Sequence, residues 1–149
     1  MLAVGEKAPD FTLKDPDGHD VSLHSLLGGK GILLYFYPAD WSSVCTRQLG
    51  GFCSMDGQFK SLNIRIVAVS ADHADSHKAF RERLGAQFVM LSGTKEVFDR
   101  YGICLPNGFA NRSYFLLDKD GIIKYMHVMA RPDQMMENEE LIEKLKNAR

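Results

Sequence analysis

The chain has 149 residues, the length of one average domain, so we expect a single domain spanning residues 1–149. Apolar residues make up 45% and charged residues 25%, which excludes collagen-like, disordered and coiled-coil chains. The 18 Lys and Arg against 19 Asp and Glu give a net charge of -1 without a basic run, which argues against a nucleic-acid partner. No apolar run approaches the roughly 20 residues that cross a bilayer, and the N-terminus does not resemble an export signal, so we expect no membrane association and a cytoplasmic protein.

The first elements predicted along the chain are a hairpin and a buried strand. Asp10–Leu13 and Asp20–Leu23 flank the turn-forming run Asp15–Gly18, a pattern typical of two antiparallel strands. Gly31–Tyr37 is continuously apolar, as expected for a central strand covered on both faces. Pro38 ends this strand because proline cannot donate a ladder hydrogen bond.

Helices and strands then alternate. Apolar positions at spacings of three to five predict a helix from Ser43 to about Leu62, capped by Ser42 or Ser43. The elements expected after it are strand Ile64–Ser70, helix Ala74–Leu84, strand Phe88–Leu91, helix Lys95–Tyr101, strands Ser113–Leu117 and Ile122–Val128 around a hairpin turn at Asp118–Gly121, and helix Glu139–Asn147.

This order predicts an α/β thioredoxin-like fold: a mixed central sheet with helices on both faces and an N-terminal hairpin. In open α/β sheets, sites form where the carboxyl ends of strands meet the following helix. The segment Tyr37–Cys45 is such a junction, and it is the first candidate for a functional site.

The cysteines point to a reduced compartment and to one reactive thiol. Cys45, Cys53 and Cys104 are an odd number, and no two have the Cys-x-x-Cys spacing, so a disulfide framework is not expected. Cys45 falls in the first turn of the predicted helix, where free backbone N–H groups and the helix dipole favour an anion. We therefore expect its thiol to ionise easily.

The segment from Tyr35 to Thr46, Tyr-Phe-Tyr-Pro-Ala-Asp-Trp-Ser-Ser-Val-Cys-Thr, resembles the peroxiredoxin active-site segment. Pro38, Ser42 and Cys45 occupy the fixed places of its Pro-x-x-x-Thr/Ser-x-x-Cys pattern. An opening resembling the family's lies at Ala8–Leu13, and Arg112 matches the strand-borne active-site arginine. The resemblance runs from about Val4 to Tyr125. It is nearest to the bacterioferritin comigratory protein and one-cysteine alkyl hydroperoxide reductase branches.

The resemblance implies a thiol peroxidase that reduces hydrogen peroxide or alkyl hydroperoxides, with Cys45 becoming a sulfenic acid. Arg112 would hold the thiolate and stabilise charge on the departing oxygen. The Ser42 hydroxyl would bond to the thiolate or the peroxide, and Pro38 would shield the sulfur. The expected partners are a peroxide substrate and thioredoxin or another small thiol reductant, with no cofactor or metal, in a monomer or homodimer.

Several residues near this motif have other expected roles. Gln48 stands where the family commonly has Glu, and if that side chain orients an arginine, Gln would hold the cation less strongly. We interpret Asp40 as a solvated turn residue and Trp41 as loop packing. His73 and His77 have the spacing of a zinc pair, but without an evident third ligand we expect them on a solvated helix face.

Three routes for recycling the oxidised Cys45 remain open. Cys53 lies eight residues further on, about 12 Å along an intact helix, so a disulfide needs the helix to unwind. Gly50 and Gly51 between them would ease this opening, or they permit close packing around a core Cys53. Cys104 could also approach Cys45, and an external thiol is the third route.

The same cysteine is compatible with two functions other than peroxidase activity, which the sequence supports unequally. A thioredoxin-type disulfide reductase needs a second thiol close behind the first, and Cys45-Thr46-Arg47-Gln48 has none. The alternative that stays open is a peroxide sensor or thiol-dependent chaperone that uses the same cysteine without multiple turnover.

Overall fold

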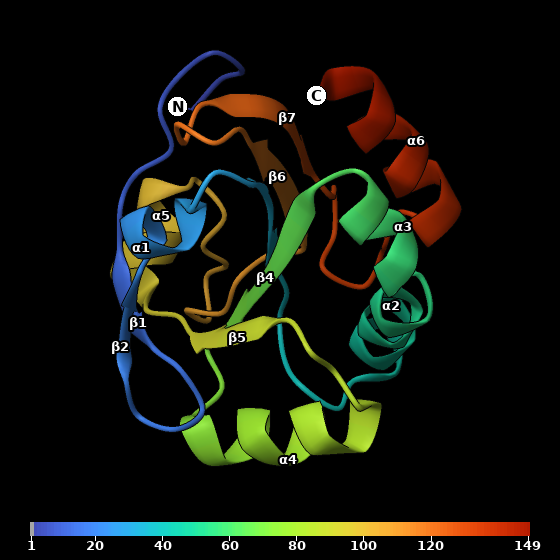
Figure 1. Cartoon of the computed structure of the whole chain (residues 1–149). Helices are drawn as coiled ribbons and strands as arrows, with labels where there is room; N and C mark the ends of the chain where they lie inside the picture. The colour runs from blue at the N-terminus through green and yellow to red at the C-terminus, as the bar shows by residue number, and fades with distance from the viewer. Residues whose placement is uncertain (1) are drawn as a thin grey trace.

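A seven-stranded mixed sheet forms the centre of the protein, described here for residues 2–149 by a computed structural model (Figure 1). Its strand order is β2-β1-β5-β4-β3-β6-β7, in which β3, β4 and β5 run parallel and the other pairs are antiparallel. The strands are β1 (Thr12–Lys14), β2 (Asp20–Ser22), β3 (Gly31–Phe36), β4 (Ile64–Ser70), β5 (Val89–Ser92), β6 (Ser113–Leu117) and β7 (Ile123–Val128).

Helices cover both faces of this sheet (Figure 1). On one face α1 and α5 contribute to one apolar cluster, and on the other α2, α3, α4 and α6 contribute to a second. The helices are α1 (Leu23–Leu27), α2 (Ser43–Ser54), α3 (Asp56–Ser61), α4 (Ala74–Leu84), α5 (Lys95–Arg100) and α6 (Asn138–Ala148).

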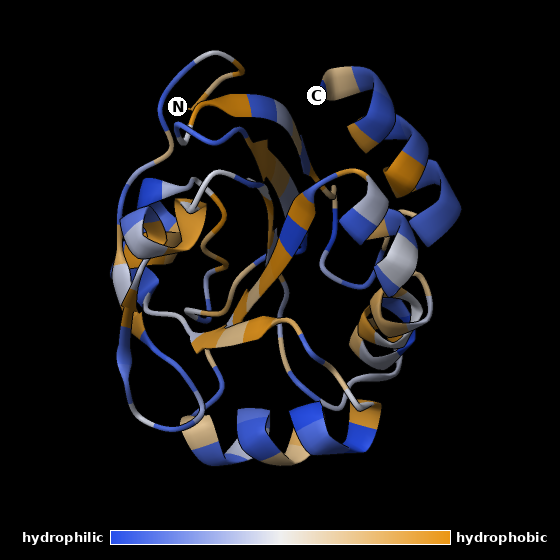
Figure 2. Ribbon diagram, viewed as in Figure 1, coloured by the Kyte–Doolittle hydropathy of each residue, from blue (hydrophilic) through white to orange (hydrophobic). Residues whose placement is uncertain are grey.

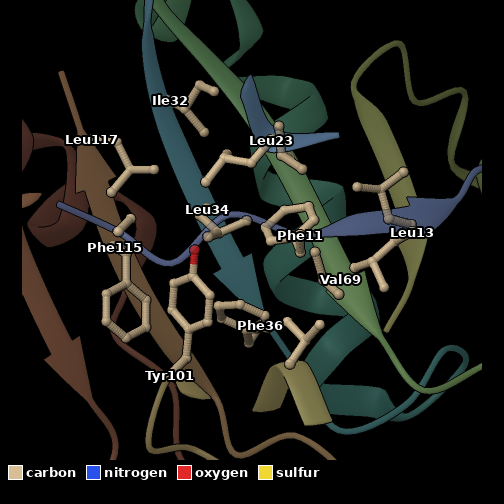
Figure 3. Close-up of a cluster of buried hydrophobic side chains, with 14 of the residues drawn as sticks. Phe11, Leu13, Leu23, Ile32, Leu34, Phe36, Val69, Tyr101, Phe115 and Leu117 are labelled. Carbon is tan, nitrogen blue, oxygen red and sulfur yellow. The ribbon is translucent and has the colours of Figure 1, made fainter. Parts of the chain in front are cut away.

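Residues of β3 alternate between the two clusters because successive side chains of a strand point to opposite faces. Leu34 and Phe36 lie in the first cluster, shown in Figure 3 with Phe115 from β6 and Tyr101 from the end of α5. Tyr35 lies in the second cluster. Figure 2 shows that the central strands β4 and β5 are largely hydrophobic. The covering helix α4 is mostly hydrophilic, with isolated apolar positions.

The fold class predicted from the sequence, a mixed sheet with helices on both faces and an N-terminal hairpin, is confirmed. Strands Ile64–Ser70 and Ser113–Leu117 and helix Ala74–Leu84 have the predicted bounds. The remaining predicted strands and the last two helices differ by one or two residues at their ends. Within residues 2–149, none of the helices combines the length and apolar character needed to cross a bilayer.

The prediction of one helix from Ser43 to Leu62 is wrong. The chain bends at Met55, whose φ of -104° and ψ of 16° interrupt the helix and separate α2 from α3. The bend directs Phe59 against Phe52, with ring centroids 5.5 Å apart in the second cluster. The short helix α1 was not predicted at all.

Candidate active site

Cys45 lies in the first turn of α2, directly after the junction with β3. Ser42 is the N-cap residue, and its hydroxyl oxygen accepts the backbone N–H of Cys45 at 3.2 Å. An accepting hydroxyl keeps its own proton free to donate, so the capping bond leaves Ser42 with a donor. Cys45 itself is fully buried, with 0% of its surface exposed.

A buried guanidinium contacts the Cys45 sulfur. Arg112 immediately precedes β6, which pairs with β3, and only 1% of its surface is exposed. Its Nη2 donates to Cys45 Sγ at 3.2 Å and to the Pro132 carbonyl at 3.1 Å. Its Nη1 donates to the Tyr35 hydroxyl, and its Nε donates to the Gln134 carbonyl at 2.9 Å. The guanidinium is therefore held on three sides and directed at the sulfur.

The electrostatics of this group favour a cation beside a neutral phenol. Burial opposes the charge of Arg112, but Tyr35 and Cys45 more than offset it and raise the pKa of the guanidinium above its ordinary value. Burial raises the pKa of Tyr35 well above its ordinary value, so the phenol stays protonated. The sulfur thus faces a permanent positive charge inside the protein, where attraction between charges is stronger than in water.

Asp40, interpreted from the sequence as a solvated turn residue, is buried, with 6% of its surface exposed. Its carboxylate accepts the hydroxyls of Tyr37 at 2.5 Å and Ser76 at 2.9 Å, and lies 2.8 Å from Nδ1 of His77. Its backbone N–H donates to the Asp72 carboxylate at 2.7 Å. The earlier interpretation is therefore wrong: Asp40 ties the loop that precedes Cys45 to α4.

The expectation of a solvated histidine pair holds only for His73, which is exposed. His77 has 0% of its surface exposed, and its Nε2 lies 3.4 Å from the Ser70 hydroxyl, on the side opposite Asp40. The Ser70 hydroxyl in turn donates to Asp72 at 2.6 Å. Ser76 and His77 of α4 thus bind Asp40 in the loop between β3 and α2, the β3–α2 loop.

Pro38 and Trp41 of the same loop are more exposed than Asp40. Pro38 is half-buried and lines a cavity of about 280 Å³ with Ala71, Asp72, His73, Ser76 and Phe109. Trp41 adopts a left-handed φ of 70° and leaves 52% of its surface exposed. One side of its ring packs on Phe80, with centroids 4.9 Å apart, in agreement with the loop-packing interpretation.

The condition considered from the sequence, that the side chain at position 48 orients an arginine, is not met by a direct contact: the hydrogen-bond partners of the Gln48 side chain are other groups. Its side chain is fully buried one turn after Cys45 and bonds to three groups: the Tyr114 hydroxyl, the Met136 carbonyl and the Asn138 side chain. These residues connect α2 to β6 and to the start of α6.

The structure separates the other two thiols from Cys45. Cys53 is half-buried near the end of the same unbroken helix α2, so a Cys45–Cys53 disulfide requires α2 to unwind. Cys104 packs against the first cluster, on the opposite face of the sheet from Cys45. Burial raises the pKa of both thiols. The negative charges of Asp56 near Cys53 and of Asp99 near Cys104 raise it further. Cys45 is the thiol that contacts a guanidinium.

Sequence reasoning missed several groups that shape the site. Tyr35 was assigned only to a buried strand, although strand alternation places it on the face opposite Phe36, where α2 packs. A tyrosine in a fully buried strand needs a partner for its hydroxyl, and that signal was available. The carbonyls of Pro132 and Gln134 carry no such signal, because every residue has a carbonyl.

Comparison with known proteins agrees with this arrangement. Residues 4–126 match the AhpC/TSA family. Peroxiredoxin Q from Triticum aestivum is 37% identical over 129 residues, which cover 85% of this chain and 59% of that protein. This chain therefore spans less than two thirds of the length of that plant relative.

A bacterial relative and a solved structure correspond over more of their length. The putative peroxiredoxin bcp of Coxiella burnetii is 32% identical over 130 residues, covering 82% of this chain and 85% of that protein. The crystal structure of Enterococcus faecalis AhpC has a TM-score of 0.87 at 29% identity, covering 99% of this chain and 92% of that one. The family match, the relatives and the cysteine–arginine pair agree, and the chain belongs to the AhpC/TSA family of peroxiredoxins.

Proposed function

We propose that this chain is a thiol peroxidase that reduces hydrogen peroxide or alkyl hydroperoxides with the Cys45 sulfur. The observation that carries the proposal is the 3.2 Å contact between Cys45 Sγ and Arg112 Nη2, both enclosed by protein. Membership of the peroxiredoxin family supports the same activity.

The reaction is a displacement at oxygen. The Cys45 thiolate attacks the terminal oxygen of the peroxide, a sulfur–oxygen bond forms and the oxygen–oxygen bond breaks. Cys45 keeps the attacked hydroxyl as a sulfenic acid, and the other oxygen leaves as hydroxide or alkoxide and takes a proton from water. Arg112 stabilises the thiolate before the attack, and its N–H groups stabilise the charge that develops on the departing oxygen. Ser42, with a hydroxyl proton free, would donate to the sulfur or the peroxide.

Access to the sulfur needs a local displacement, because Cys45 has no exposed surface in this conformation. The β3–α2 loop and the chain that follows β7 both border the pair, through Ser42 and through Pro132. Hydrogen peroxide requires a smaller opening than a branched alkyl hydroperoxide. We therefore expect hydrogen peroxide to react faster than tert-butyl hydroperoxide.

Recycling completes the proposed cycle. An incoming thiol attacks the sulfenic acid, water leaves and a mixed disulfide forms, and a second thiol then releases reduced Cys45. We favour thioredoxin or another small external thiol as the reductant, because Cys104 lies across the sheet and Cys53 is within reach only after α2 unwinds.

The test is peroxide consumption by the wild-type protein and by Cys45→Ser, Cys53→Ser and Cys104→Ser, each with thioredoxin plus its reductase or with dithiothreitol. We expect consumption of many equivalents per subunit, abolished only in Cys45→Ser. Consumption of a single equivalent despite excess reductant would instead identify a peroxide sensor or thiol-dependent chaperone. Peptide mapping after one equivalent of peroxide identifies any disulfide formed with Cys53 or Cys104.

A further inference from the structure

The orientation of Arg112 depends on a segment without regular secondary structure. Residues 129–137, which we call the β7–α6 segment, supply the Pro132 and Gln134 carbonyls. These are two of the four acceptors of the guanidinium. A shift of the β7–α6 segment would therefore move the guanidinium relative to the sulfur.

Hydrogen bonds hold both ends of the β7–α6 segment, through half-buried groups at its start and buried groups at its end. At the start of the segment, the Met129 N–H donates to the Arg112 carbonyl at 3.0 Å, and the Met129 carbonyl accepts from the Asn111 side chain at 2.9 Å. At its end, the Met136 carbonyl accepts Nε2 of Gln48 at 2.7 Å, and the Met136 N–H donates to the Tyr114 hydroxyl at 3.0 Å.

Gln48 is the centre of the second attachment. Its Oε1 accepts the Tyr114 hydroxyl proton at 2.5 Å, and its Nε2 also donates to Asn138 Oδ1 at 3.0 Å. Both atoms of the side-chain amide are thus used, and the whole side chain is buried. A backbone carbonyl can only accept, so the Met136 carbonyl fixes which end of the amide faces it.

This network explains why an amide suits position 48. A glutamate of the same shape could still accept from Tyr114, but it offers no N–H to the Met136 carbonyl or to Asn138 Oδ1 when ionised. It would instead place a buried negative charge against two acceptor oxygens. Gln48 and Cys45 share α2, so the helix that carries the thiolate also anchors the segment that directs its cation.

We propose that Gln48 is a positioning residue for the peroxidase reaction, whose amide fixes the β7–α6 segment and thereby holds the Arg112 guanidinium on the Cys45 sulfur. This assignment rests on the proposed function. Gln48 itself does not contact the sulfur, and its effect passes through Met136 and the carbonyls of Pro132 and Gln134 to Arg112.

The test compares Gln48→Glu with controls in a Cys53→Ser, Cys104→Ser background, so that Cys45 is the one remaining thiol. The readouts are the rate constant for a single oxidation by hydrogen peroxide and the pH profile of Cys45 alkylation by iodoacetamide. We expect Gln48→Glu to lower the oxidation rate constant about tenfold and to move the alkylation midpoint to higher pH.

Two controls separate positioning from a general loss of structure. Arg47→Gln removes the exposed ion pair of 3.1 Å between α2 and Glu137 of the β7–α6 segment. We expect the oxidation rate constant to stay within about twofold of the background and the alkylation midpoint to stay at the same pH. Leu145→Ala removes a buried side chain from α6 and lowers the thermal midpoint without altering the alkylation profile.

The outcomes decide the inference. Wild-type behaviour of Gln48→Glu in both readouts overturns it, as does an identical change in Leu145→Ala. If Gln48→Glu does not fold, Tyr114→Phe decides by the same readouts, since it frees Oε1 of Gln48 and the Met136 N–H while keeping the ring. A background protein that does not consume peroxide would refute the proposed function, and the alkylation profiles would still test the role of Gln48.

Discussion

At the scale of single residues, the site depends on the shape of one guanidinium. The Arg112 side chain donates to a sulfur, a phenol and two carbonyls at once, which uses three separate nitrogens in one plane. An ammonium offers three donors around a single point and has no second nitrogen to place. Charge alone therefore does not reproduce the contact with Cys45.

Arg112→Lys tests this directly. We expect the rate constant for oxidation of Cys45 by hydrogen peroxide to fall about 100-fold, because the lysine cannot hold the carbonyls and reach the sulfur together. The measurement is single-turnover oxidation followed by quenching with a thiol reagent. Arg131→Lys, an exposed arginine paired with Asp133, is the matched control and is expected to react like the wild type. A fully active Arg112→Lys would show that any nearby cation suffices.

At the scale of elements, the β3–α2 loop is held by helix α4. Asp40 in the loop and His77 in α4 are both buried, and the carboxylate and the ring nitrogen lie 2.8 Å apart. Removing one partner leaves the other group buried with fewer polar contacts, which costs far more than losing an exposed pair. The position of α4 is thereby linked to the start of α2, where Cys45 lies.

His77→Leu is expected to lower the free energy of unfolding by about 3 kcal/mol, because Asp40 keeps its burial and loses the imidazole. Urea denaturation at neutral pH measures the change. His73→Leu, on the exposed N-cap position of the same helix, should alter stability by no more than about 0.5 kcal/mol. Equal midpoints for the two variants would refute a stabilising role for the buried pair.

The elements also show what the sequence could predict. Strand β4 has its predicted bounds because it is a short, almost continuously apolar run, and helix α4 has them because Gly85 ends a segment of helical length. The bend at Met55 was missed because Phe59 continues the helical spacing of α2 while its direction is set by contact with Phe52. Helix α1 is too short to show a periodic pattern.

In the candidate site, too, some features could be predicted from the sequence and others could not. The motif and the separate strand match singled out Ser42, Cys45 and Arg112, and the structure shows Ser42 capping the helix that carries Cys45 and Arg112 contacting the Cys45 sulfur. Their roles in the reaction stay a prediction. The burial of Asp40 was not predictable from its turn-like neighbours, because two of its partners, Ser76 and His77, come from α4, more than thirty residues away. The carbonyl contacts of Arg112 depend on how the β7–α6 segment folds back, which no residue type specifies.

Over the protein as a whole, both apolar clusters contain tyrosines with buried phenol groups. All five tyrosines have a pKa above the ordinary value, in each case chiefly because burial disfavours the phenolate. Burial raises the pKa of Tyr114 to about 12 against an ordinary 10.0, although the hydrogen bond that its oxygen accepts from the Met136 N–H acts in the opposite direction. Burial also raises the pKa of Tyr35 and Tyr37 well above the ordinary value.

These shifts predict a decline in stability at alkaline pH. The folded protein holds the phenolic protons more tightly than the unfolded chain, so their contribution is complete below the unfolded pKa near 10 and is lost as pH rises towards the folded value. For Tyr114 the loss between pH 10.0 and about 12 amounts to about 2 kcal/mol. Urea unfolding across this range measures it, and Tyr114→Phe should show a shallower decline than the wild type. Coincident phenolate absorbance titrations of the native and the urea-denatured protein would contradict the prediction, because they would mean that folding leaves the phenols as accessible to water as in the unfolded chain.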